Sequence, residues 1–187
     1  MTTHFALLNN NHDPATVRKA INFHLGSQPI KIIETEIVPD SFHARFSAIE
    51  RRYLYRILNR QSPPTLDCGR VWHVPRKLDI AEMQEAAEIL IGEHDFSSFR
   101  AKDCQAASPI KTINMIKLSK SGDEIHIVAH AKSFLHRQIR NIVGSLKLVG
   151  EGKWDPEDIE RILLTKNRAK AGPTAPAEGL YFLEVIY

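Results

Sequence analysis

The sequence predicts an α+β fold built on a mostly antiparallel sheet. Several segments alternate apolar and polar residues as strands do, while others repeat apolar residues every three or four positions as helices do. The expected order is strand, helix, strand, followed by strand, strand, helix, strand, strand, helix, helix, strand. Strands that follow one another directly favour hairpins, which are antiparallel. The 187 residues are enough for one or two domains.

Composition narrows the class of protein. The chain is 43% hydrophobic and 25% charged, which is typical of a globular domain, and no apolar run reaches the length of a membrane span. The first residues lack the basic and apolar regions of a signal peptide. Cys68 and Cys104 lack the spacing of a metal or redox pair, so we interpret both as free thiols in a reducing cytoplasm.

The first 47 residues predict a strand, a helix and a second strand. Residues 2–8 form the first expected strand. Asp13 before Pro14 is typical of a helix start, and Gly26 of a helix end. Residues 30–38 form the second expected strand.

A second unit is expected to begin at residue 48. Residues 48–58 alternate as a strand, residues 62–64 form a proline-rich turn, and residues 70–74 form a short strand. Asp79 begins a helix, and Glu82 stands three residues later, at capping-box spacing.

The segment 92–108 is expected to be a loop. Phe96 and Phe99 would anchor it, and Arg100 would reach outward. The adjacent acids and histidine at 93–95 suggest a metal site at first sight. However, three consecutive side chains of a regular element do not converge on one ion, and no further ligands stand at metal-site spacing. We therefore predict no metal.

The remaining elements follow the same patterns. Residues 111–118 and 124–131 predict a hairpin, and residues 134–149 carry the apolar stripe of an amphipathic helix. Asp155 and Pro156 begin another helix. Residues 179–187 form the last expected strand.

The stretch 42–57 concentrates chemistry. It holds four arginines and four aromatic rings, a combination that suits phosphates and unpaired bases. Its second half alternates, so that one face carries Tyr53, Tyr55 and Ile57 and the other carries Arg52, Leu54 and Arg56. A net charge of only +3 adds little to an argument for nucleic acid. The arginines could equally form a solvated face.

A second basic group falls on the helix expected at 134–149. His136, Arg137 and Arg140 are predicted opposite its apolar stripe. Arg140 stands beside the packed stripe, where a partly dry guanidinium pairs strongly with a carboxylate or phosphate. The alternative is a solvated arginine on an amphipathic helix.

Four segments, 42–55, 92–102, 133–150 and 177–183, together resemble the TruA family of bacterial tRNA pseudouridine synthases. The resemblance runs in order from about His4 to the end of the chain. It implies two ferredoxin-like α+β domains around a basic cleft, homodimers, and conversion of uridines at positions 38 to 40 of the tRNA anticodon arm into pseudouridine. It also implies that the target base is flipped out and that neither cofactor nor metal is needed.

The resemblance assigns roles to single residues. Tyr53 falls on the tyrosine that stacks on the target base, Arg140 on the arginine that pairs with the catalytic aspartate, and Leu180 on the leucine that lines the pocket. Tyr53 could otherwise be a buried strand tyrosine. The residues expected to contact RNA are Arg45, Arg51, Arg52, Arg100, His136 and Arg137.

The family's catalytic aspartate stands in a Gly-Arg-Thr-Asp-Ala-Gly-Val-His motif, which these 187 residues do not contain. Asp40, Asp95 and Asp103 fall at ordinary loop positions of the family. We therefore expect residues 1–47 to be the remnant of an N-terminal domain without its upstream half, residues 48–187 to be the C-terminal domain, and the chain alone to be inactive. The alternative function is a non-catalytic tRNA-binding remnant.

Overall fold

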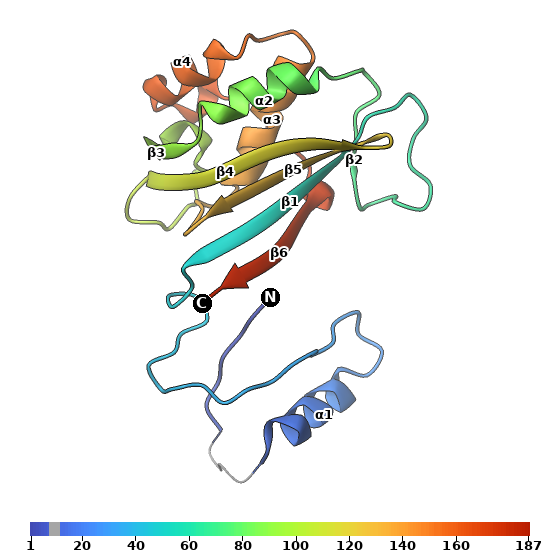
Figure 1. The fold of residues 1–187 in the computed structure, drawn as a ribbon, viewed down its shortest axis with the longest axis vertical. Helices are drawn as coiled ribbons and strands as arrows, with labels where there is room; N and C mark the ends of the chain where they lie inside the picture. Colours follow the sequence, from blue (N-terminus) through green and yellow to red (C-terminus); the bar gives the residue numbers. More distant parts are fainter. Residues whose placement is uncertain (8–11) are drawn as a thin grey trace. The chain divides into compact units, whose positions relative to one another are not determined.

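A computed structural model describes residues 1–7 and 12–187. The chain divides into two compact units, Thr2–Ala48 and Ile49–Tyr187 (Figure 1). Each unit is described here by itself.

The larger unit is built on a six-stranded sheet. Its strands are β1 (Glu50–Leu58), β2 (Trp72–His73), β3 (Gly92–Asp95), β4 (Ile110–Ser121), β5 (Glu124–Ala131) and β6 (Leu180–Ile186). The strand order is β2-β1-β5-β4-β3, and β6 also pairs with β1. Only β1 and β2 are parallel, so the sheet is mostly antiparallel, as predicted.

Three helices cover one face of this sheet: α2 (Ile80–Glu88), α3 (Gln138–Gly150) and α4 (Glu157–Thr165) (Figure 1). The predicted apolar stripe of α3 is confirmed, because Leu135, Ile139, Ile142, Leu146 and Val149 are all buried. Phe96 and Phe99 are fully buried as well. Each fully buried side chain of this size contributes about 2 kcal/mol through the hydrophobic effect.

The start of α2 follows half of the predicted capping box. The Asp79 carboxylate accepts hydrogen bonds from the backbone N–H groups of Ala81 and Glu82, at 3.0 and 3.2 Å. The reciprocal bond from Glu82 is replaced, because the backbone N–H of Asp79 donates to the carbonyl of Gly150 at 2.8 Å. This bond ties the start of α2 to the end of α3.

Two expectations about element boundaries in this unit are wrong. Gly92–Asp95 is strand β3 rather than loop, because its backbone pairs with β4, a long-range contact that local sequence does not reveal. The helix expected from residue 134 begins at Gln138. Arg137 adopts a left-handed conformation (φ 61°) and the Gln138 side chain accepts the N–H of Leu135, which together close a turn ahead of the helix.

Strand β6 contains a bulge that re-aims its side chains. Arg52 pairs with Glu184, but the next residue, Tyr53, pairs with Phe182, so Leu183 is the extra residue. The bulge places Phe182 on the face of Tyr53 and Glu184 on the face of Arg52. If the Tyr53–Phe182 register continued without the bulge, Glu184 would pair with Arg51 and lie on the face of Tyr53.

The described residues of the smaller unit contain one helix, α1 (Pro14–Leu25). Its predicted ends are confirmed: the Asp13 carboxylate accepts the Thr16 N–H at 3.0 Å, and Gly26 follows the helix with φ 52°. The two strands expected on either side of it are wrong, because residues 2–7 and 30–38 form no strand. Leu8 lies outside the described residues.

Side chains of α1 hydrogen-bond to the backbone in the middle of the second expected strand, residues 30–38. The amide of Asn22 both accepts the N–H of Ile32 and donates to its carbonyl, each at 2.8 Å. Arg18 donates to the carbonyl of Ile33 at 3.0 Å. These backbone groups of Ile32 and Ile33 are therefore satisfied by helix side chains rather than by a neighbouring strand.

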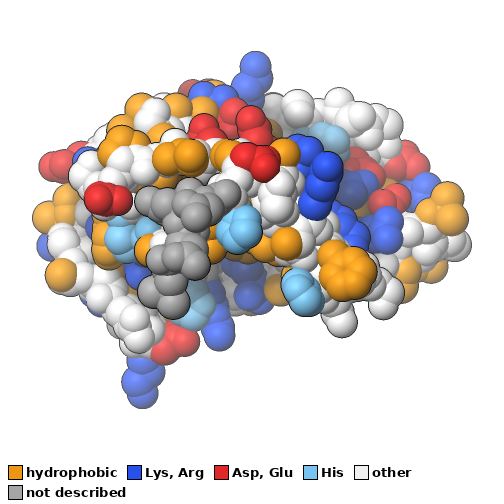
Figure 2. All heavy atoms as spheres, turned by 90° about the horizontal axis from the view of Figure 1, so that it is seen from below, with side chains coloured by type: hydrophobic (Ala, Val, Ile, Leu, Met, Phe, Trp, Pro, Cys, Tyr) orange, Lys and Arg blue, Asp and Glu red, His pale blue; other side chains and the backbone are white. Residues whose placement is uncertain are grey.

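Hydrophobic side chains of the smaller unit face solvent. The exposed ones are Phe5, Leu7, Phe23, Ile30, Ile33, Ile37 and Phe46. Figure 2 shows orange hydrophobic side chains at the surface beside basic and histidine side chains. Among the described residues of this unit, Ala48 is the only buried one, so the unit has almost no core of its own.

Candidate functional site

Tyr53 lies near the middle of β1, on the face that packs against the helices. Its ring meets Phe134 and Phe182 edge to face, with centroids 5.4 and 5.1 Å apart. Burial raises the pKa of its hydroxyl, so the ring stays neutral at physiological pH. Tyr53 is only partly buried, and the two phenylalanines fix its orientation.

Tyr55 lies on the same face of β1 as Tyr53. It is fully buried, and its hydroxyl donates to the carbonyl of Pro176 at 2.6 Å. Gly179 lies directly on its ring, since a Cβ at this glycine would fall 2.6 Å from Cζ of Tyr55. The turn that precedes β6 is therefore fitted closely to Tyr55.

Arg140 lies on α3 and meets the same turn. Its Nε donates to the carbonyl of Ala175 at 2.6 Å, and the Ala175 N–H donates to the carbonyl of Arg140 at 3.0 Å. Two consecutive carbonyls of the turn thus accept hydrogen bonds from the site: Ala175 from Arg140, and Pro176 from Tyr55. Among the residues that the structure describes, no carboxylate lies within ion-pair distance of Arg140. Its charge is available to an anion.

Leu180 completes this group as the first residue of β6. It pairs with Tyr55 across the sheet, while Phe182 pairs with Tyr53. The β1–β6 pairing therefore sets Tyr53 and Leu180 on one face of the sheet, and the turn that leads into Leu180 is hydrogen-bonded to Arg140. These are the three residues that the sequence singled out. We call this group the inner site.

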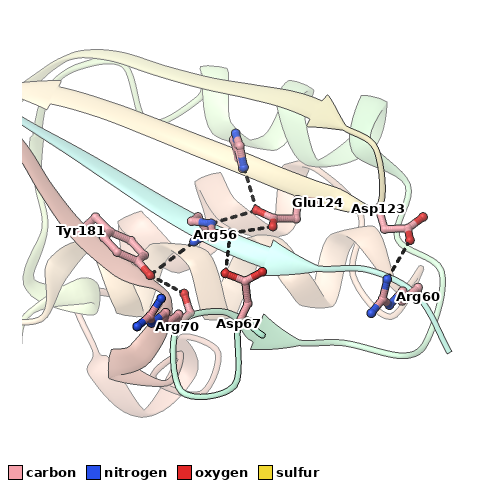
Figure 3. A network of polar contacts seen from close by, with 8 residues as sticks. Arg56, Arg60, Asp67, Arg70, Asp123, Glu124 and Tyr181 are labelled. Atoms are coloured by element: carbon pink, nitrogen blue, oxygen red, sulfur yellow. Dashed lines mark hydrogen bonds and ion pairs between the residues drawn. The ribbon is translucent and has the colours of Figure 1, made fainter. Parts of the chain in front are cut away.

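The opposite face of β1 is chemically different. Arg56 makes a two-bond ion pair with Glu124 (2.8 and 2.7 Å), and its guanidinium also reaches Asp67 at 3.2 Å (Figure 3). Tyr181 lies under the guanidinium and donates its hydroxyl to the carbonyl of Arg70. We call these residues, with His126, which contacts Glu124 at 2.9 Å, the outer network.

Each carboxylate of the outer network forms an ion pair with Arg56. Hydrogen bonding to Arg56 lowers the pKa of Glu124 to about 2, against its ordinary value of 4.5. Arg56 correspondingly has a raised pKa. The network ties the connection between β1 and β2 to the sheet.

Comparison with known proteins decides the family. The family model for tRNA pseudouridine synthase matches residues 86–187. A protein named tRNA pseudouridine synthase A from Rhodospirillum centenum is 56% identical over 171 residues, which cover 91% of this chain and 70% of that protein. One of the same name from Rhodospirillum rubrum is 57% identical over 173 residues, 92% of this chain and 62% of that protein.

This chain belongs to the tRNA pseudouridine synthase family. The chain spans about two thirds of the length of these relatives.

The residues expected to contact RNA lie in varied environments in this member of the tRNA pseudouridine synthase family. Arg52 pairs with Glu50 and Glu184 at 2.7 and 2.9 Å, and Arg51 donates to the carbonyl of Lys132. Arg45 lies over the ring of Phe46, with Cζ 5.6 Å from its centroid.

The other three lie near the start of α3. The expectation that Arg100 reaches outward is wrong: its Nη2 donates to the carbonyls of Cys104 and Ala106, at 2.8 and 2.6 Å, and so holds its own loop. His136 and Arg137 are exposed, and His136 lies 3.3 Å from Asp103. Both precede the helix, so they are not one turn from Arg140 on its surface as predicted.

The described residues contain no group of three His, Cys, Asp or Glu side chains that could hold a metal ion. In the same part of the chain, no helix is long and apolar enough to cross a membrane.

Sequence reasoning missed the residues that dock the turn at 172–175 onto α3. They include Asn141, Arg168 and Thr174, which share hydrogen bonds. The sequence does carry one signal, Gly144, which lies inside the predicted helix 134–149. A glycine inside a helix indicates that the backbone of another segment lies close to it. A Cβ there would fall 1.7 Å from the carbonyl oxygen of Pro173.

Proposed function

We propose that this chain supplies the base-binding part of a tRNA pseudouridine synthase that isomerises uridines at positions 38 to 40 of the anticodon arm. The observation that carries this proposal is the inner site. It combines an oriented aromatic ring, an apolar side chain and a guanidinium without a carboxylate partner among the described residues. A flipped uridine needs these three contacts: stacking, a dry wall, and a positive charge near the reacting group.

Each residue then has a distinct task. Tyr53 stacks on the uracil ring, and Leu180 keeps water from one side of it. Arg140 pairs with the catalytic aspartate of the family motif, which lies outside this sequence. Its Nε is already occupied by Ala175, so the terminal Nη groups are the ones that meet the carboxylate.

RNA contacts outside the pocket fall to basic side chains. We assign this role to Arg45, Arg51, Arg52, Arg100, His136 and Arg137. His136 and Arg137 are exposed beside the start of α3 and approach phosphates directly. Arg52 exchanges carboxylates for phosphates, and Arg100 acts by shaping its loop, because each already has strong partners.

Residues 1–47 are the partial N-terminal domain in this proposal, and residues 48–187 the C-terminal domain. The exposed apolar side chains of the smaller unit support this, since they need a further segment to cover them. In the intact protein we further propose a cytoplasmic homodimer, which sedimentation of the full-length protein tests.

The decisive experiment is tritium release from tRNA that carries 5-tritiated uridine. The 187-residue chain should release none, and the chain extended upstream by a segment with the Gly-Arg-Thr-Asp motif should release it. Mapping pseudouridine in the product tests positions 38 to 40. Release by the unextended chain would overturn the claim that it is inactive alone.

A non-catalytic tRNA-binding chain is the second candidate, favoured by the absence of the aspartate motif from this sequence. It predicts tRNA binding that weakens steeply with salt, because phosphate contacts release counterions. It also predicts that the upstream extension adds affinity but no tritium release.

A further inference from the structure

Arg168 carries a charge that no acid neutralises in the described structure. Its Nη1 donates to the carbonyl of Gly172 at 2.9 Å, and its Nη2 to the side-chain oxygens of Asn141 (3.0 Å) and Thr174 (2.9 Å). All of these acceptors are neutral, and no carboxylate of the described chain lies within ion-pair distance. Burial lowers the pKa of Arg168, which shows that the position costs the charge some of its hydration.

The acceptors of Arg168 belong to both sides of one interface. Asn141 is buried on α3, where its Nδ2 donates to the carbonyl of Phe99 at 2.8 Å. Its Oδ1 accepts from Arg168 and also from the Thr174 hydroxyl, at 2.7 Å. A planar fork reaches helix and turn together, which the single ammonium of lysine does not do.

The turn lies against α3 at backbone distance. The Gly172 N–H donates to Oγ of Ser145 at 2.9 Å, and a Cβ at Gly172 would fall 2.8 Å from Cα of Ser145. Pro173 lies against Gly144 in the same way. Backbones this close fit together in only one relative position. The guanidinium of Arg168 adds side-chain hydrogen bonds that hold the turn and α3 in that position.

The register of the turn fixes the inner site. Thr174, which Arg168 holds, is followed by Ala175, whose carbonyl accepts Nε of Arg140 at 2.6 Å. Asn141, the other partner, directly follows Arg140 on α3. Arg168 therefore binds Asn141 and Thr174, which are the chain neighbours of the two residues joined by the Arg140–Ala175 hydrogen bond.

We propose that Arg168 is a positioning residue that sets the orientation of Arg140, so that the terminal Nη groups of Arg140 face an incoming carboxylate or phosphate. This proposal rests on the proposed function only for the identity of that anion. The positioning itself is a property of this chain and is measurable without RNA.

The test is the exchange of the Arg140 Nε–H with water, observed by NMR on the ¹⁵N-labelled 187-residue chain. Loss of the signal in Arg140→Lys assigns it. In Arg168→Lys, which keeps the charge but not the fork, we expect exchange at least tenfold faster. Thr174→Val, nearly equal in volume, removes one acceptor of the fork and should act in the same direction.

The Nε–H of Arg56, bonded to Glu124, is the internal control and should keep its rate in both variants. An unchanged Arg140 signal in folded Arg168→Lys would overturn the proposal, even if global stability falls, because a merely structural role predicts that pattern. If Arg168→Lys does not fold, Thr174→Val decides by the same criterion. Failure of tRNA binding with a responsive Arg140 signal would refute the proposed function alone.

Discussion

The two faces of β1 use arginine in opposite ways. On the outer face, Arg56 is enclosed by Glu124 and Asp67 in two-bond and single-bond ion pairs. On the helix side, Arg140 and Arg168 are held by carbonyl, amide and hydroxyl oxygens. The sequence shows arginines in both places, and only their partners distinguish them.

This difference indicates which arginines can still bind an anion. A guanidinium held in a shielded carboxylate pair, such as that of Arg56, gains little from a further anion, since the new partner must displace the old one. The more exposed pairs of Arg52 exchange partners at a smaller cost. A guanidinium oriented by neutral oxygens keeps its charge and gains a strong partner when an anion arrives. On this basis we propose that the outer network serves stability and the inner site serves binding.

The largest loss of stability is expected where the turn meets α3. Gly144→Ala places a methyl group 1.7 Å from the Pro173 carbonyl, so backbone must move. We expect a loss of about 3 kcal/mol, the upper end for overpacking, in urea unfolding. Gly150→Ala is the matched control, because its new methyl meets the flexible Met83 side chain and should cost less. Equal losses would contradict the account of the turn.

Breaking the outer network should cost less. Glu124→Gln leaves Arg56 with Asp67 alone, and we expect a loss of about 2 kcal/mol, between the values for surface and buried pairs. Asp67→Asn should cost less than this, because its bond is longer (3.2 Å) and more exposed. Neither substitution should alter the Arg140 Nε–H signal; a change there would contradict the separation of the two faces.

The pH dependence of stability isolates the same network. The pKa of Glu124 is about 2 in the folded chain, below its ordinary 4.5, so its contribution is complete above pH 4.5. That contribution should be lost as the pH falls from 4.5 towards 2. The difference in unfolding free energy between wild type and Glu124→Gln should shrink over this range. A constant difference would refute the assignment.

The smallest effect is expected at Arg52. Its ion pairs with Glu50 and Glu184 are substantially exposed, with side-chain exposures of 37% for Arg52 and 52% for Glu184. Arg52→Gln should change the unfolding free energy less than either substitution in the outer network, because exposed ion pairs contribute little. A loss as large as that of Glu124→Gln would show that exposure does not separate the two pairs.

Periodicity alone predicted the core of the fold. The stripe of α3, the β4–β5 hairpin and the alternation of β1 follow from local patterns, and each is present. Local patterns could not reveal β3, whose pairing depends on β4, or the bulge at Leu183. The strands expected around α1 are wrong because a strand requires a partner that the pattern does not contain.

The candidate site divides in the same manner. Tyr53, Arg140 and Leu180 were found by resemblance. The β1–β6 pairing sets Tyr53 and Leu180 on one face of the sheet, and the hydrogen bond to Ala175 holds Arg140 at the turn before β6. The ion pairs of Arg52 and Arg56 were not foreseen, since their partners are distant in sequence. Arg168 was missed because its acceptors are neutral groups on two different segments.

The central claim is that the inner site binds RNA and the outer network does not. The most direct test is the affinity of the 187-residue chain for an anticodon stem-loop RNA, measured at one low salt concentration for wild type, Arg140→Gln and Arg56→Gln. Because these 187 residues lack the aspartate motif, we expect Arg140 to meet a phosphate of the stem-loop in this chain. We therefore predict at least about tenfold weaker binding for Arg140→Gln, as expected for loss of a charge-assisted contact, and unchanged affinity per folded molecule for Arg56→Gln. Wild-type affinity in Arg140→Gln, or an equal loss in Arg56→Gln, would contradict the account.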